Sequence, residues 1–148
     1  MPRIDDGYQT LITLANDPTL KIYEKEVTPP GYQGGGPIDT TTMRNETLRT
    51  ASPKSLKTLS PMTIVAAYET EAYADLRDQI NENQLITVTF PDGASLHFWG
   101  WVDEFTPGAL TEGEQPTATV TIIPSNHDEG TPQLEVAAWW ENPTGSAF

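Results

Sequence analysis

The chain has 148 residues, close to the usual size of one domain, and 36% of them are hydrophobic. It has no cysteine and only two histidines, which excludes disulfides, cysteine nucleophiles and thiolate or histidine-rich metal sites. The formal net charge is −13, and the last basic residue is Arg77, so the chain should repel nucleic acid rather than bind it. The acidity is explained either by ordinary solubility or by a surface that must not adhere to DNA. Residues 1–6 lack the apolar stretch of a signal peptide, and no apolar run is long enough for a membrane span, so we expect synthesis in the cytoplasm.

Most of the chain has the alternating apolar pattern of β-strands. Strands are predicted at residues 8–14, 20–27, 54–69 with a break at Ser60-Pro61, 84–90, 94–105 and 116–123. Pro91-Asp92-Gly93 is a strong turn signal between two of them. We therefore expect residues 1–125 to form a mainly β domain, a twisted antiparallel β sandwich or open barrel.

One helix is predicted, at about residues 71–82. Tyr73, Leu76 and Ile80 form a single apolar stripe at helical spacing. Thr70 is a suitable N-cap, and Asn81 is a plausible terminator. This helix is expected to pack on the β domain as its only helical layer.

Residues 28–52 form a long segment with little apolar content. It contains Pro29-Pro30-Gly31 and Gly34-Gly35-Gly36-Pro37, which do not suit regular structure. The Thr-rich stretch that follows has β propensity but almost nothing to bury. Long loops of this kind tend to be functional, and this one is expected to become stable only against a partner.

The last part of the chain, residues 126–148, is rich in turns and acidic side chains. It contains one apolar cluster that includes Trp139 and Trp140. Two adjacent tryptophans are costly to leave in water, so we expect them to dock either on the domain or on a neighbouring subunit.

We find no catalytic constellation and no cofactor motif. The triple glycine is followed by neither Lys-Ser/Thr nor a helix, which excludes a P-loop. His127 and Asp128 are adjacent on a predicted loop, an arrangement that rarely forms a working pair. The acidic pairs Asp103-Glu104 and Glu112/Glu114 lack the spacing of a calcium loop, so we predict no metal site. The chain is expected not to be an enzyme.

Several pieces of the sequence, taken in order, resemble the tail tube proteins of long-tailed, non-contractile bacteriophages. They are the run Ile38-Asp39-Thr40-Thr41-Thr42-Met43-Arg44-Asn45 with Arg49-Thr50, the helix before Leu85-Ile86-Thr87-Val88-Thr89-Phe90-Pro91-Asp92-Gly93, the run Phe98-Trp99-Gly100-Trp101-Val102, and Gly113-Glu114-Gln115-Pro116 before the last strand. The resemblance covers roughly residues 5–126, and nothing after Asn126 matches it.

The resemblance implies a fold shared with type VI secretion tubes, hexameric rings stacked into a hollow tail tube, and a place in the virion tail. Genomic DNA would pass through an electronegative lumen during ejection without specific binding, and a tape-measure protein and a tail terminator would be partners. The segment from Ile38 to Asn45, with Arg49, would contact the next ring. Candidate lumen acids are Glu24, Glu26, Asp103 and Glu104. Arg44, Arg49, Lys54 and Lys57 would pair with acidic side chains of a neighbour, and residues 126–148 would form an arm against one.

Three other interpretations stay open on the sequence alone. The first is another ring-forming tail component, such as a terminator or a secretion-tube-like protein. The second is a carbohydrate-binding β sandwich that stacks sugars on tryptophans, with candidates Trp99, Trp101, Trp139 and Trp140. The third is an enzyme with a carboxylate pair, although no pair is singled out by the sequence.

Overall fold

The computed structural model describes residues 10–18 and 22–142, and it is mainly β with one α-helix in these residues. The chain divides into two units, Met1–Pro29 with Pro61–Phe148, and Pro30–Ser60. No helix of the described chain is long and apolar enough to cross a membrane.

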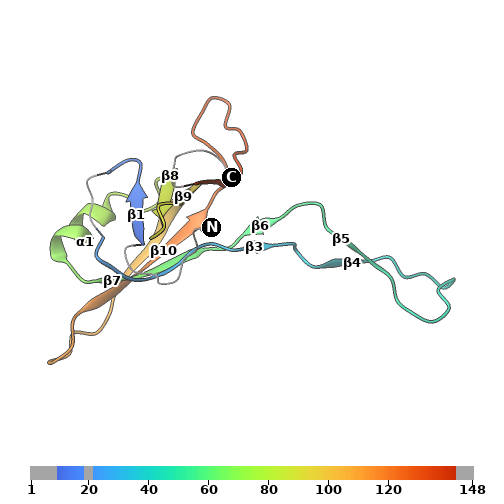
Figure 1. The fold of residues 1–148 in the computed structure, drawn as a ribbon, viewed down its shortest axis with the longest axis horizontal. Coiled ribbons are helices and arrows are strands. Elements are labelled where there is room, and N and C mark those ends of the chain that lie inside the picture. The colour runs from blue at the N-terminus through green and yellow to red at the C-terminus, as the bar shows by residue number, and fades with distance from the viewer. Residues whose placement is uncertain (1–9, 19–21, 143–148) are drawn as a thin grey trace. The chain divides into compact units, whose positions relative to one another are not determined.

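The first unit is built on one antiparallel sheet with the strand order β1-β8-β9-β10-β7-β2 (Figure 1). A further short strand, β11, pairs with the beginning of β9. The bounds are β1 Leu11–Leu14, β2 Glu24–Thr28, β7 Met62–Ala67, β8 Gln84–Thr89, β9 Ser95–Pro107, β10 Thr117–Pro124 and β11 Trp139–Glu141. These strands confirm the antiparallel, mainly β fold expected from the alternating pattern. Tyr8 and Leu20, at the starts of two expected strands, lie outside the described residues.

One face of this sheet encloses the core. Alternate residues of β7, β8, β9 and β10 are fully buried, as period-2 alternation requires when one face is covered. The largest contributor is Phe98 of β9, and β1 adds Ile12 and Leu14. In β10 the buried residues of this alternation are Ala118, Val120 and Ile122.

The sheet is an open barrel rather than a closed one. Among the described residues, β1 pairs only with β8 and β2 pairs only with β7 in the sheet, so the two edge strands share no backbone ladder. The edges nevertheless approach each other, because the backbone N–H of Ile12 in β1 donates a hydrogen bond to Oε1 of Glu24 in β2 at 3.1 Å. A side chain therefore closes the seam that backbone pairing leaves open.

The helix α1 spans Thr70–Arg77, which is shorter than the range expected from the sequence. Ile80 forms a parallel bridge with Val102, and the N–H of Asn81 donates to the carbonyl oxygen of Val102 at 2.9 Å, so pairing with β9 ends the helical path. The helix ends at the C-cap Asp78, so the expected terminator Asn81 lies three residues beyond the cap, although it does adopt a positive φ of 65°. The prediction that Thr70 caps the helix was wrong: Glu69 is the N-cap and makes no side-chain cap hydrogen bond.

Residues 30–60 form a hairpin of short strand pairs, where the sequence suggested an irregular loop over 28–52. Strand β3 (Tyr32–Gln33) pairs with β6 (Thr58–Leu59), and β4 (Pro37–Asp39) pairs with β5 (Ala51–Pro53), so the two arms run side by side (Figure 1). The break expected at Ser60-Pro61 falls between β6 and β7. Almost every residue of the hairpin is exposed, so backbone pairing rather than a core defines it.

Candidate assembly surfaces

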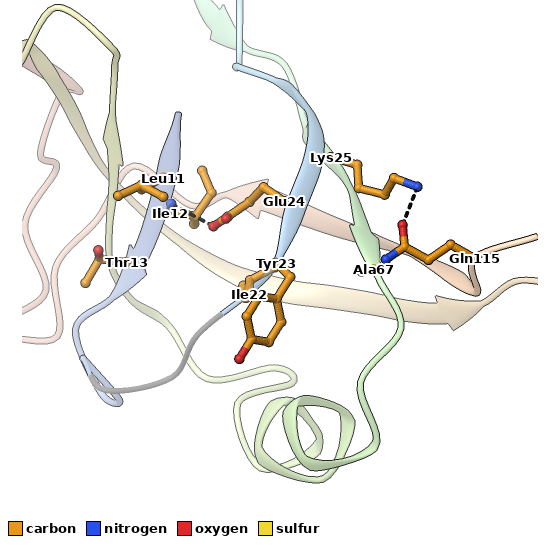
Figure 2. Close-up of a pocket in the computed structure, with 9 residues that line it drawn as sticks. All are labelled: Leu11, Ile12, Thr13, Ile22, Tyr23, Glu24, Lys25, Ala67 and Gln115. Atoms are coloured by element: carbon orange, nitrogen blue, oxygen red, sulfur yellow. Dashed lines mark hydrogen bonds between the residues drawn. The ribbon is translucent and has the colours of Figure 1, made fainter. Parts of the chain in front are cut away.

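A cleft lies at the open seam between β1 and β2 (Figure 2). Its volume is about 630 Å³, and its lining is mostly apolar. The lining residues are Leu11, Ile12, Thr13, Ile22, Tyr23, Glu24, Lys25, Ala67 and Gln115. Leu11 and Tyr23 keep 51% and 54% of their surface in solvent, which is high for large side chains at the mouth of a cleft.

Glu24 and Lys25, adjacent on β2, point in different directions from this cleft. Figure 2 shows the Glu24 carboxylate turned across the seam toward Ile12, while the Lys25 ammonium is directed to Gln115 Oε1, 2.8 Å away. Burial raises the pKa of the Glu24 carboxyl, and the hydrogen bonds from its own backbone N–H and from that of Ile12 only partly oppose this effect. The cleft therefore holds a partly desolvated carboxylate beside apolar side chains.

The tip of the hairpin is ordered by its own polar groups. The carboxylate of Asp39 accepts from the backbone N–H of Thr41 at 2.9 Å and lies 3.6 Å from the Arg49 guanidinium. Hydrogen bonds from the hydroxyl and the N–H of Thr41 lower the pKa of Asp39. Asn45 Oδ1 accepts from the N–H of Thr42 at 3.1 Å, and Asn45 Nδ2 donates to the carbonyl of Leu48 at 2.9 Å. The structure thus brings together Asp39, Thr41, Asn45 and Arg49 of the predicted contact segment.

Several large apolar side chains of the same hairpin are exposed. Met43 is as exposed as in an isolated chain, at 104%, and Leu48 is 79% exposed, while Ile38 is about half exposed. The unit from Pro30 to Ser60 has four basic and two acidic residues, which gives it a net charge of +2. Because the whole chain has a net charge of −13, the remaining residues together carry −15. An exposed, apolar and basic hairpin in a strongly acidic protein is suited to bind an acidic surface.

The C-terminal strand β11 docks on β9 of the same chain. The ring of Trp139 stacks on His97 with centroids 5.1 Å apart, and Trp140 stacks on Phe90 at 5.7 Å. Nε2 of His97 lies 3.3 Å from Oε2 of Glu141. Of the two placements expected for the tryptophans, the structure shows docking on the domain.

Ser95, His97 and Glu141 do not form a catalytic relay. Both Ser95 Oγ and Glu141 Oε2 approach the same imidazole nitrogen, Nε2, at 3.0 and 3.3 Å, while Nδ1 lies 3.1 Å from Thr87 Oγ1. A relay requires the carboxylate and the nucleophile on opposite nitrogens. The cluster instead attaches β11 to the sheet. Sequence reasoning missed it, and the only signal was a histidine on a strand that also carries Trp99 and Trp101.

The acidic side chains proposed for a lumen are not brought together. Glu24 and Glu26 lie on β2, whereas Asp103 and Glu104 lie on β9, and β10 and β7 separate these strands in the sheet. Glu26, Asp103 and Glu104 are exposed, and Glu104 accepts a hydrogen bond from Thr106. In residues 10–18 and 22–142, no group of three or more His, Asp or Glu side chains is placed to hold a metal ion.

Comparison with known proteins adds information at the level of structure alone. No protein-family model matches the chain, and no curated protein sequence gives a significant match. A chain described as "Virion of native gene transfer agent (GTA) particle" is similar over 97% of this chain and 98% of that one, with a TM-score of 0.61 and 10% identity. The "Crystal structure of Hcp protein" is similar over 94% of both chains, with a TM-score of 0.55 and 7% identity. The chain therefore has the fold of these two proteins, as expected from its sequence resemblance to tail tube proteins.

Proposed function

We propose that this chain is a structural subunit of a virion tail tube, in which rings of six copies stack into a hollow conduit for genomic DNA. The observation that carries the proposal is the similarity of fold, over nearly the whole of both chains, to a chain of a gene transfer agent virion. The same proposal includes a tape-measure protein and a tail terminator as partners, and no enzymatic activity.

The open seam of the barrel supports self-assembly. Edge strands such as β1 and β2, each paired with only one other strand among the described residues, are a liability in a monomer because their outer edges and apolar side chains invite other chains. An assembly of identical subunits that closes into rings and stacks can cover such surfaces without leaving a growing end in the plane of the ring. The hairpin of residues 30–60 then contacts the next ring and gives the stack its direction.

The charge distribution supports a conduit for DNA. Phosphate groups bind proteins mainly through Lys and Arg, and a wall rich in carboxylates offers no such contacts. With a charge of −15 outside the hairpin, the subunit can present acidic side chains to the passing duplex, and Glu26, Asp103 and Glu104 remain the proposed lumen residues. Glu24, the fourth candidate, turns its carboxylate into the seam between β1 and β2 and is no longer proposed to face the lumen. DNA is expected to slide through without specific binding.

Negative-stain electron microscopy of the concentrated protein, and of any particle that contains it, tests this function. We expect hollow rings or tubes of uniform diameter. Deletion of Thr40–Asn45 should then prevent stacking while the circular dichroism spectrum and the unfolding temperature of the remaining domain stay unchanged. Monomers alone in the concentrated protein, together with the absence of rings from the particle, would overturn the proposal.

A further inference from the structure

Among the described residues, no cationic side chain is paired with the carboxylate in the seam cleft. Glu24 receives one hydrogen bond across the seam, from Ile12, and in residues 10–18 and 22–142 no ion pair involves it. The nearest base in sequence, Lys25, is turned to Gln115. A partly buried carboxylate is stabilised when a cation reaches it, and guanidinium is the group best suited to a partly desolvated pair. The cleft thus suits a ligand that is apolar and carries one positive charge.

The hairpin tip presents these two features on adjacent residues. Met43 is fully exposed, and its unbranched thioether side chain adapts well to irregular apolar clefts. The backbone N–H of Arg44 donates a hydrogen bond to Thr42 Oγ1 at 3.3 Å. The guanidinium of Arg44 makes no ion pair with any described residue. Arg49, by contrast, is already paired with Asp39. Met43 and Arg44 are therefore available to a partner, while the network around Asp39 and Asn45 holds the tip in shape.

We propose that the cleft between β1 and β2 receives the hairpin tip of a second copy of the chain, with Met43 between Leu11 and Tyr23 and Arg44 paired with Glu24. The inference rests on the proposed tube, and it names the surface that receives the hairpin. A second copy is the occupant because the complementary charges and apolar groups are both encoded in this one chain, on an acidic and a basic unit. In a stack of rings, the hairpins of each ring then fill the clefts of the adjacent ring, and only the clefts of one end ring stay empty.

Disulfide trapping tests the contact directly, because the chain has no cysteine to give a background. A Met43→Cys variant is mixed with a Tyr23→Cys variant that carries a mass tag, under assembly conditions and mild oxidation. We expect a disulfide-linked heterodimer on non-reducing gels. The matched control replaces Tyr23→Cys by Leu134→Cys, an exposed apolar position outside the cleft, and should give at least about tenfold less heterodimer.

Charge reversal provides a second, independent measurement. Glu24→Arg and Arg44→Glu should each raise the concentration needed for assembly by at least about tenfold, as expected for one desolvated charge pair, and the double variant should recover most of the loss. Circular dichroism checks that each variant folds.

The outcomes separate this inference from the function on which it rests. Tubes that form normally without the Met43–Tyr23 disulfide, or with equal trapping at Leu134, would overturn the cleft as the receiving surface and leave the tube intact. Failure of both the wild-type chain and its particle to show rings would overturn the two together. Charge-reversed single variants that assemble like the wild type would likewise refute the Glu24–Arg44 pair.

Discussion

Substitution of Gly100 by alanine probes a close approach between two strands of the barrel. Gly100 of β9 lies opposite Pro124 of β10, near a register irregularity between Thr121 and Ile122. A Cβ atom at Gly100 would lie 2.6 Å from the carbonyl oxygen of Ile123 and 3.2 Å from Cα of Pro124, whereas real Cβ contacts essentially never fall below 3.0 Å. Both neighbours are backbone atoms, so no flexible side chain can move aside.

The expected cost follows from this overlap. Overpacking of a close-fitted site costs about 1–3 kcal/mol. Alanine returns about 0.4–1 kcal/mol by restricting the unfolded chain. The net loss has a midpoint of about 1.3 kcal/mol and an upper end of about 2.6 kcal/mol, which corresponds to a decrease of roughly 3–8 °C in the unfolding temperature of a domain of this size.

Thermal unfolding followed by circular dichroism measures this loss. The matched control is Gly34→Ala in the hairpin, where a Cβ would meet no atom within 4 Å and φ is not positive, so its unfolding temperature should be unchanged or slightly higher. If Gly100→Ala unfolds at the same temperature as the wild type, β9 and β10 do not approach as closely as described, and the reasoning is refuted.

Three further predictions concern other side chains of the barrel. Gln84→Met should lower the free energy of unfolding by about 1–3 kcal/mol in urea titrations, because Gln84 is 1% exposed and its Oε1 accepts the N–H of Asn16 at 2.9 Å; an unchanged midpoint would contradict this. Glu24→Gln should raise the unfolding temperature of the monomer at pH 7. Folding raises the pKa of the Glu24 carboxyl, so the folded state binds the proton more tightly than the unfolded state does. The folded protein therefore loses stability as the pH rises through that pKa and the carboxyl ionises. A neutral amide does not ionise, so Gln at this position avoids the loss. The gain should vanish below the pKa of the unfolded carboxyl, and a gain that persists there would exclude desolvation as its cause. His97→Ala should remove the ring stack and the contact with Glu141, and speed hydrogen exchange of β11 roughly two- to tenfold; equal exchange rates would show that the His97 contacts do not hold β11.

The alternating strands were predictable because their signal is local. In 84–90 and 116–123 the apolar side chains recur at every second residue, and burial of Ile86, Val88, Val120 and Ile122 follows from one covered face. The turn at Pro91-Asp92-Gly93 was equally local. Asp92 Oδ1 accepts the N–H of Ala94 at 2.9 Å, and Gly93 has a φ of 91°, which favours glycine.

The hairpin and the docking of β11 were less accessible to sequence reasoning. In residues 30–60 the strands are two or three residues long and exposed, so no hydrophobic period marks them, and they exist through cross-strand pairs such as Ile38 with Ser52. The contact of His97 with Glu141 joins residues far apart in the chain. Neither residue type nor spacing identifies such a pair before the strands are placed beside each other.

The sequence by itself determined the mainly β class, the positions of the longest strands, the existence of the helix α1 and the strong acidity. All of these depend on residue type and on repeats of apolar residues every two to four positions, and such repeats are visible within a single segment of the chain. Only the tertiary structure decided that β1 and β2 face each other across an open seam, that Glu24 rather than a backbone ladder bridges it, and that the tryptophans of β11 lie on their own domain. These features depend on which edges and faces the curled sheet brings together, and that arrangement arises from the packing of many strands at once rather than from any one segment.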